Sequence, residues 1–232
     1  MTEKSASTPE EPPDVADDDL RAGFTVLARL LERLYRFSRP KGPVSQAGPG
    51  DPDEVLQPFR TVVSELVRAL KNPSLPMVAF LACSTALRKS MKADRAESLM
   101  TRASSAEALI FAALAKPGLV DPRVVAAIDS ARSAAARHER PTIETIAAGK
   151  RISAPHLGRL VKEETGFDFT DWRTAFILRP SVSALLETNQ DVKQIACGRL
   201  GFKHLSQFDH EFHRFFGLTP TEFRQFRPAR RS

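Results

Sequence analysis

Cysteine is scarce in this 232-residue sequence, which contains only Cys83 and Cys197, both in stretches with a helical pattern. Two cysteines so far apart argue against a disulfide framework and against a cysteine-rich metal site. Such usage is typical of a reducing compartment, and we therefore expect a cytoplasmic location. No residue pattern calls for a cofactor.

Long hydrophobic runs are missing as well. The two longest, around residues 76–83 and 109–115, fall far short of the roughly 20 apolar residues that a membrane-spanning helix needs. The N-terminus is acidic and polar, which is not the pattern of a secretory signal. The sequence therefore predicts a soluble protein with no membrane attachment.

Strand-like alternation of apolar and polar residues is also lacking, and apolar residues recur instead at steps of three and four. Residues 1–16 are rich in Glu, Asp, Ser and Pro, which predicts a disordered acidic tail. Residues 17–117 are predicted to form a helical bundle for dimerisation, sensing or partner binding, with a domain boundary near Gly118. Its four apolar faces are centred on 24–35, on 55–70, on 77–87 and on the alanine-rich stretch that ends at Leu114.

Positive charge is concentrated in the second half of the chain. Residues 121–232 contain 18 basic and 13 acidic side chains, and therefore carry +5 of the net charge of +6. A basic C-terminal half is compatible with nucleic-acid binding but does not require it.

The C-terminal half is organised around residues 195–224, which read IACGRLGFKHLSQFDHEFHRFFGLTPTEFR. The turn between two predicted helices contains Gly201, which can take a positive φ, and Phe202, which can fill the angle between the helices. Gly217 then ends the second helix, and Thr219-Pro220 has the pattern of a cap that begins another. The second helix has one apolar face, formed by Phe208, Phe212, Phe215 and Phe216.

Residues 142–166 repeat this layout, and an internal repeat of this kind predicts two similar structural units. Asp121-Pro122 has the pattern of a helix start before the first unit, and a helix with Phe169, Trp172 and Phe176 is predicted to connect the two units. The matching positions are Ile146-Ala147 with Ile195-Ala196, Leu157 and Val161 with Phe208 and Phe212, and Gly166 with Gly217, Ser153 being the cap of the first unit's second helix.

These residues resemble the C-terminal DNA-binding domain of the AraC/XylS family of bacterial transcription regulators. The shared elements, spread over residues 121–227, are Ile-Ala, Ser-x-x-x-Leu-x-Arg-Leu, Gly-Phe, Phe-x-x-x-Phe and Gly-x-Thr-Pro-x-x-x-Arg. The resemblance implies two helix-turn-helix units, 142–166 and 191–217, whose recognition helices enter successive major-groove segments on one face of the duplex. The whole chain is thus expected to be all-α, with a helical bundle followed by this domain and a basic tail at 228–232.

The outer faces of the two recognition helices hold the candidate DNA-binding residues. Arg159 is the candidate for a bidentate contact to guanine, with a surface ion pair to Glu163 as its alternative role, and Lys162 is placed for phosphate. Gln207 can pair with adenine, whereas Asp209 would be repelled by phosphates unless it accepts from a cytosine amino group. The full set is Ala154, Pro155, His156, Arg159 and Lys162, with Gly158 beside them, and Leu205, Ser206, Gln207, Asp209, His210 and His213.

Three features depart from the family pattern or leave a role open. Compared with the family pattern, one extra residue stands between Ile195 and Gly201. Gly198 would loosen the first helix of the second unit. Pro180 lies inside the connecting helix and predicts a kink near 177–179. The arginines at 224, 227, 230 and 231 are either a solvated tail or a phosphate-binding flank.

The leading hypothesis is a sequence-specific transcription regulator that binds double-stranded DNA, with RNA polymerase as a further candidate partner and a homodimer formed through residues 17–117. An enzyme is not expected, because neither cysteines nor a carboxylate cluster complete a metal-ligand set around the five histidines. The alternative is a protein-interaction adaptor whose helix-turn-helix units have lost DNA binding, as Asp209 and Gly198 would favour.

Overall fold

The computed structural model describes residues 52–92 and 121–227, together with isolated helical positions at 29, 30, 32, 106, 108 and 110. Every regular element in these ranges is helical, which confirms the all-α fold. Several predictions lie outside the described residues: the tail 1–16, most of the helix at 24–35, the alanine-rich stretch apart from those positions, the boundary near Gly118, and the tail 228–232.

Two long helices, α2 (Pro52–Lys71) and α3 (Met77–Lys92), confirm the helices predicted around 55–70 and 77–87. They pack against each other as a hairpin. The turn between them begins at Asn72, whose Oδ1 accepts a hydrogen bond of 2.9 Å from the backbone N–H of Ser74. Leu66, Leu70 and Leu81 are among the fully buried side chains that hold the hairpin together.

The first helix-turn-helix unit follows a capping helix. Asp121 accepts a hydrogen bond from the backbone N–H of Arg123 at the start of α5 (Pro122–Ala136), as the Asp-Pro pattern predicted. The unit itself consists of α6 (Ile143–Ala148) and α7 (Ala154–Thr165). Ser153 occupies the cap position of α7 but its side chain makes no capping hydrogen bond. Gly166 ends α7 with φ of 80°, the left-handed conformation that glycine adopts most readily.

The connecting helix α8 (Phe169–Glu187) joins the two units and is buried along most of its length. Its start is fixed to α7 by Trp172, whose indole N–H donates to Oγ1 of Thr165 over 3.1 Å. The helix continues through Pro180 without interruption. Whether it bends there, as the proline predicts, stays a prediction.

The second unit consists of the π-helix η1 (Gln194–Arg199), α9 (Leu205–Phe216) and α10 (Pro220–Arg224). Gly201 in the turn has φ of 68° and Gly217 after α9 has φ of 79°, as the sequence predicted. Thr219 and Glu222 form a reciprocal capping box at the start of α10, which confirms the predicted Thr-Pro helix start.

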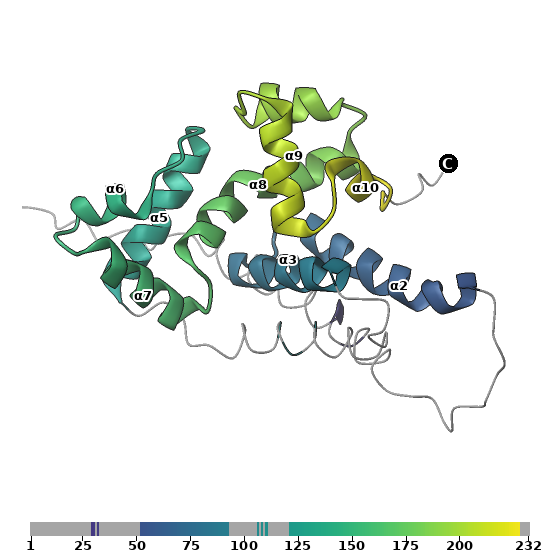
Figure 1. Cartoon of the computed structure of the whole chain (residues 1–232), viewed down its shortest axis with the longest axis horizontal. Coiled ribbons are helices and arrows are strands. Elements are labelled where there is room, and N and C mark those ends of the chain that lie inside the picture. The colour runs from purple at the N-terminus through teal and green to yellow at the C-terminus, as the bar shows by residue number, and fades with distance from the viewer. Residues whose placement is uncertain are drawn as a thin grey trace, which may run out of the picture.

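The α2–α3 hairpin is packed onto the second unit (Figure 1). The ring of Phe80 in α3 lies 6.4 Å from that of Phe215 and 6.1 Å from that of Phe216, centre to centre. In the turn before α3, the carbonyl oxygens of Pro73 and Leu75 accept hydrogen bonds of 2.5 and 2.6 Å from Arg179 of α8. The hairpin, α8 and α9 therefore share one continuous apolar core.

Candidate nucleic-acid interface

In the first unit, buried residues fix which face of α7 is exposed. Leu157 and Val161 are completely buried and pack in one core with Ile146 and Ala147 of α6. Arg159, two positions after Leu157, and Lys162, one position after Val161, therefore point away from the core. Pro155, Arg159 and Lys162 are exposed, while Ala154 and His156 are half-buried. Gly158, expected on the outer face, instead faces α6, where an added Cβ would lie 3.3 Å from Cδ1 of Ile143.

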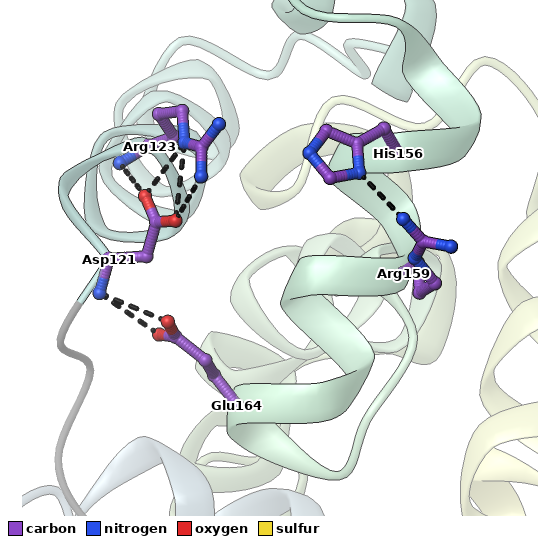
Figure 2. Close-up of polar contacts among 5 residues, drawn as sticks. All are labelled: Asp121, Arg123, His156, Arg159 and Glu164. Atoms are coloured by element: carbon purple, nitrogen blue, oxygen red, sulfur yellow. Dashed lines mark hydrogen bonds and ion pairs between the residues drawn. The ribbon is translucent and has the colours of Figure 1, made fainter.

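Arg159 is held by its neighbours on the same helix. Its Nη2 lies 3.0 Å from Nδ1 of His156, and its Nε lies 3.8 Å from Oε1 of Glu163 (Figure 2 shows the contact with His156). The ion pair anticipated as the alternative role of Arg159 is therefore present. Both side chains of the pair are about two-thirds exposed, 66% for Arg159 and 62% for Glu163, so water screens their attraction. Such an exposed pair contributes little to stability.

The opposite side of α7 is tied to the start of α5. The backbone N–H of Asp121 donates to Oε1 of Glu164 over 3.0 Å, and the carboxylate of Asp121 pairs with Arg123 at 2.6 Å (Figure 2). Hydrogen bonds from the side chain and the backbone of Arg123 lower the pKa of Asp121 from 3.8 to about 2. Because Asp121 also caps α5, these bonds fix α7 against α5 while leaving Arg159 on the exposed face.

The extra residue of the second unit is absorbed by the π-helix η1. The backbone N–H of Leu200 bonds to the carbonyl of Ile195 over 3.1 Å, and that of Phe202 bonds to the carbonyl of Ala196 over 3.0 Å. These bonds span five and six residues instead of four, so one more residue fits into the turn. Ile195, Ala196 and Phe202 all remain buried, as in the predicted motif. The insertion therefore widens the helix without displacing its core residues.

The exposed face of α9 is defined in the same way as that of α7. Phe208, Phe212, Phe215 and Phe216 are buried and contact one another, with ring centres 4.5 Å apart for Phe212 and Phe216. Among the candidate residues, Ser206, Gln207, His210 and His213 are exposed on α9, whereas Leu205 is half-buried. By the matching of the two units, His210 occupies the position that Arg159 occupies on α7.

Asp209 is half-buried on the edge of α9, beside the buried phenylalanines and away from the centre of the exposed face. Burial raises the pKa of its carboxyl group. The carboxylate of Asp209 therefore does not stand at the middle of the outward face, where the sequence had suggested repulsion from DNA phosphates.

A comparison with protein families gives a match over the two helix-turn-helix units. Residues 146–225 match the family described as a helix-turn-helix domain. The C-terminal region is an AraC-type helix-turn-helix domain. Among solved structures, the chain is similar to the C-terminal domain of AraT, a response regulator from Geobacillus stearothermophilus, with 23% identity and a TM-score of 0.41 over 48% of this chain and 92% of that one. No curated protein matches the sequence. The family match supports a DNA-binding regulator of the AraC type in general.

The AraC-type domain exposes further basic residues that the sequence analysis did not select. Arg214 is exposed on α9, four residues beyond His210 and seven beyond Gln207, and therefore extends the same face. Arg151, with φ of 54°, and Lys203 are exposed in the turns that precede α7 and α9. Their place just before the two helices was visible in the sequence and could have identified them.

Two of the C-terminal arginines have a structural role that neither alternative anticipated. Arg224 donates to the carbonyl oxygen of Gln190 over 2.7 Å, and Arg227 donates to Oδ1 of Asn189 over 2.7 Å. Arg227 also bonds to the carbonyl oxygens of Leu185 and Thr188 at the end of α8. These bonds satisfy acceptors that a helix C-terminus leaves free. The arginines at 230 and 231 lie outside the described residues.

Within the described parts of the chain, no group of three or more His, Cys, Asp or Glu side chains is arranged to hold a metal ion. Nor do the described ranges contain a helix with the length and apolarity that crossing a bilayer demands.

Proposed function

We propose that this protein is a sequence-specific transcription regulator that reads two adjacent major-groove segments of double-stranded DNA with α7 and α9, here called the reading helices. The observation that carries the proposal is the pair of outward faces on α7 and α9. Each is opposite a fully buried face, and the buried helix α8 connects the two units. A helix of this kind fits the major groove, where base edges present distinct donors and acceptors.

The exposed side chains suggest how each reading helix would divide its contacts. Arg159 presents a planar guanidinium that can form two parallel hydrogen bonds to guanine, and the amide of Gln207 can do the same with adenine. Lys162, now paired with Asp168 over 3.1 Å at the protein surface, is placed for a phosphate. Ser206, His210 and His213 complete the face of α9, and Lys203 and Arg151 would add phosphate contacts in front of each helix.

The N-terminal region is proposed to regulate or pair the DNA-binding domain. The docking of Phe80 against α9 supports a mechanical link between residues 17–117 and the second reading helix. Homodimerisation through that region and contact with RNA polymerase belong to the same proposal.

The test is selection of bound fragments from random DNA with the full chain, followed by titration of the enriched fragment against salt. Two recurring half-sites in the enriched pool are expected, and log affinity should fall linearly with log salt because phosphate contacts release counterions. Failure to enrich any sequence, or affinity independent of salt, would contradict the proposal.

A second candidate function is that of a protein-interaction adaptor. It is favoured by Glu163, which places a negative charge next to Arg159 on the outward face of α7. An adaptor predicts that Glu163→Gln has no effect on DNA affinity at any salt concentration. A DNA-binding regulator predicts that the same change raises affinity, since it removes a charge that repels phosphate and competes for Arg159.

A further inference from the structure

One side chain links the segment just before the first helix-turn-helix unit to the second unit. Arg140 lies in the segment between α5 and α6, next to the first unit. Its guanidinium carbon lies 4.2 Å from the centre of the Phe202 ring in the turn of the second unit. The same guanidinium is ion-paired with Glu211 on α9.

The residues around Arg140 also lie in close contact with the second unit. His138 has φ of 60°, an uncommon conformation for a residue other than glycine. Its side chain lies so close to Gly201 that a Cβ added there would be 2.9 Å from both Cβ and Cγ of His138. The segment 138–140 thus contacts both the turn before α9 and α9 itself.

The bridge is stronger than an ordinary surface pair. The side chains of Arg140 and Glu211 are only 30% and 26% exposed, so their attraction is less screened than that of the Arg159–Glu163 pair. Arginine also stacks flat on an aromatic ring while its fork binds a carboxylate, which fixes its orientation. Two contacts in different directions from one planar group resist rotation of α9.

Glu211 also contacts Gln207, the residue proposed to pair with adenine. The same Oε1 atom that pairs with Arg140 accepts a hydrogen bond of 3.4 Å from Nε2 of Gln207. Gln207 is exposed on the outward face of α9. A chain of contacts therefore runs from Phe202 through Arg140 and Glu211 to Gln207.

We propose that Arg140 is a positioning residue that sets the orientation of α9 relative to α7, and thereby the half-site spacing that the protein accepts. This inference rests on the proposed function. Arg140 itself need not touch DNA, because it acts through Glu211 and Phe202.

The DNA test uses the full protein chain and three DNA fragments. The first fragment contains both selected half-sites, the second contains them with one base pair inserted between them, and the third contains only the half-site read by α7, here called the first half-site. One base pair rotates the second half-site by roughly 35° around the duplex, since a turn takes about 10–10.5 base pairs. Wild-type protein should bind the altered spacing at least tenfold more weakly. Arg140→Ala should bind the selected site about tenfold more weakly than wild type. It should also discriminate much less between the two spacings, while its affinity for the first half-site alone stays unchanged.

Three further variants isolate the bridge. Arg132→Ala is the matched control, because Arg132 pairs with Asp129 inside α5, and it should bind all three fragments like wild type. Glu211→Gln removes the other end of the bridge and should reproduce the loss of spacing preference. Arg140→Lys keeps the charge but not the planar fork, and its spacing penalty should lie between those of wild type and Arg140→Ala.

A measurement without DNA separates this inference from the proposed function. Spin labels are placed at Lys162→Cys on α7 and Arg214→Cys on α9 in a Cys197→Ser background. Cys83 is fully buried, and burial raises the pKa of its thiol to about 12, so it should stay unlabelled. One narrow distance is expected with Arg140 present, and a broader or shifted distribution with Arg140→Ala.

The spin-label distance and the spacing penalty test different steps of the inference. An unchanged narrow distance in Arg140→Ala, or an unchanged spacing penalty, would overturn the role of Arg140. If wild-type protein selects no DNA at all, the proposed function fails, and the label distance still decides whether Arg140 orients α9.

Discussion

Gly217, the residue that ends α9, lies directly against the backbone of Arg88 in α3. A Cβ added to Gly217 would lie 3.0 Å from Cα of Arg88 and 3.3 Å from its carbonyl oxygen. The φ of Gly217 is 79°, in the left-handed region. Glycine is therefore required twice at this position, once by the conformation of the chain and once by the close approach of two helices.

Gly217→Ala should lower the free energy of unfolding by about 1–3 kcal/mol, the typical strain of a left-handed residue with a side chain, or more if α3 must move. Gly198→Ala is the matched control, because Gly198 is exposed in η1 and an added Cβ meets nothing within 4 Å. That change should leave stability unchanged or raise it by up to about 1 kcal/mol. Urea denaturation of both variants tests the contrast, and equal effects would contradict it.

Arg159→Ala should weaken binding to the selected DNA site by about 1–3 kcal/mol, because a bidentate contact to guanine is lost. Binding to unrelated DNA should barely change. Fluorescence anisotropy at one fixed salt concentration measures both affinities, with Arg132→Ala as the control for loss of a surface arginine. If Arg159→Ala weakens both DNAs equally, Arg159 touches phosphate and not a base.

Phe212→Ala should cost about 3–5 kcal/mol of folding stability, because the change removes a fully buried ring. The ring stands at the centre of the second unit, 5.3 Å from that of Phe223 and 4.5 Å from that of Phe216. The neighbouring exposed change His213→Ala should cost less than about 0.5 kcal/mol. Chemical denaturation compares the two, and a Phe212→Ala protein as stable as wild type would show that this cluster is not a core.

The pH dependence of stability should reveal the contribution of the charged Asp121 carboxylate. Its pKa of about 2 in the folded chain is below the ordinary value of 3.8, so its charge favours the folded state above pH 3.8, and this contribution is lost as the pH falls toward 2. Asp121→Asn should therefore melt at a lower temperature than wild type at about pH 6, and the difference should shrink below about pH 4. A difference that stays constant over this range would mean that the charge of Asp121 plays no part.

Local patterns made the C-terminal domain predictable from the sequence. The matching of Ile146-Ala147 with Ile195-Ala196 located both units, and all four residues are buried. Caps and glycine helix ends at Asp121, Thr219 and Gly217 were also correct, because each depends on a few adjacent residues. The exposed residues of the candidate interface followed from the same periodicity, although their contact with DNA is still a prediction.

Contacts between distant segments could not be predicted. No local pattern shows that Arg227 bonds to the end of α8, about forty residues earlier, or that Arg140 reaches Glu211. The sequence shows the extra residue before Gly201, but its accommodation depends on which backbone carbonyls remain free in the folded chain. Likewise, Gly158 was placed outward because the position of α6 could not be known.

If α7 and α9 both bind DNA as proposed, the docking of the α2–α3 hairpin on the second unit should make their two DNA contacts unequal. Phe80 and Arg88 contact the α9 end of the molecule, whereas α6 and α7 lie at the other end (Figure 1). A displacement of α3 should reach α9 first, because α3 contacts the end of α9 directly. In a footprint, the half-site under α9 should fade before the one under α7 whenever the N-terminal helices are disturbed.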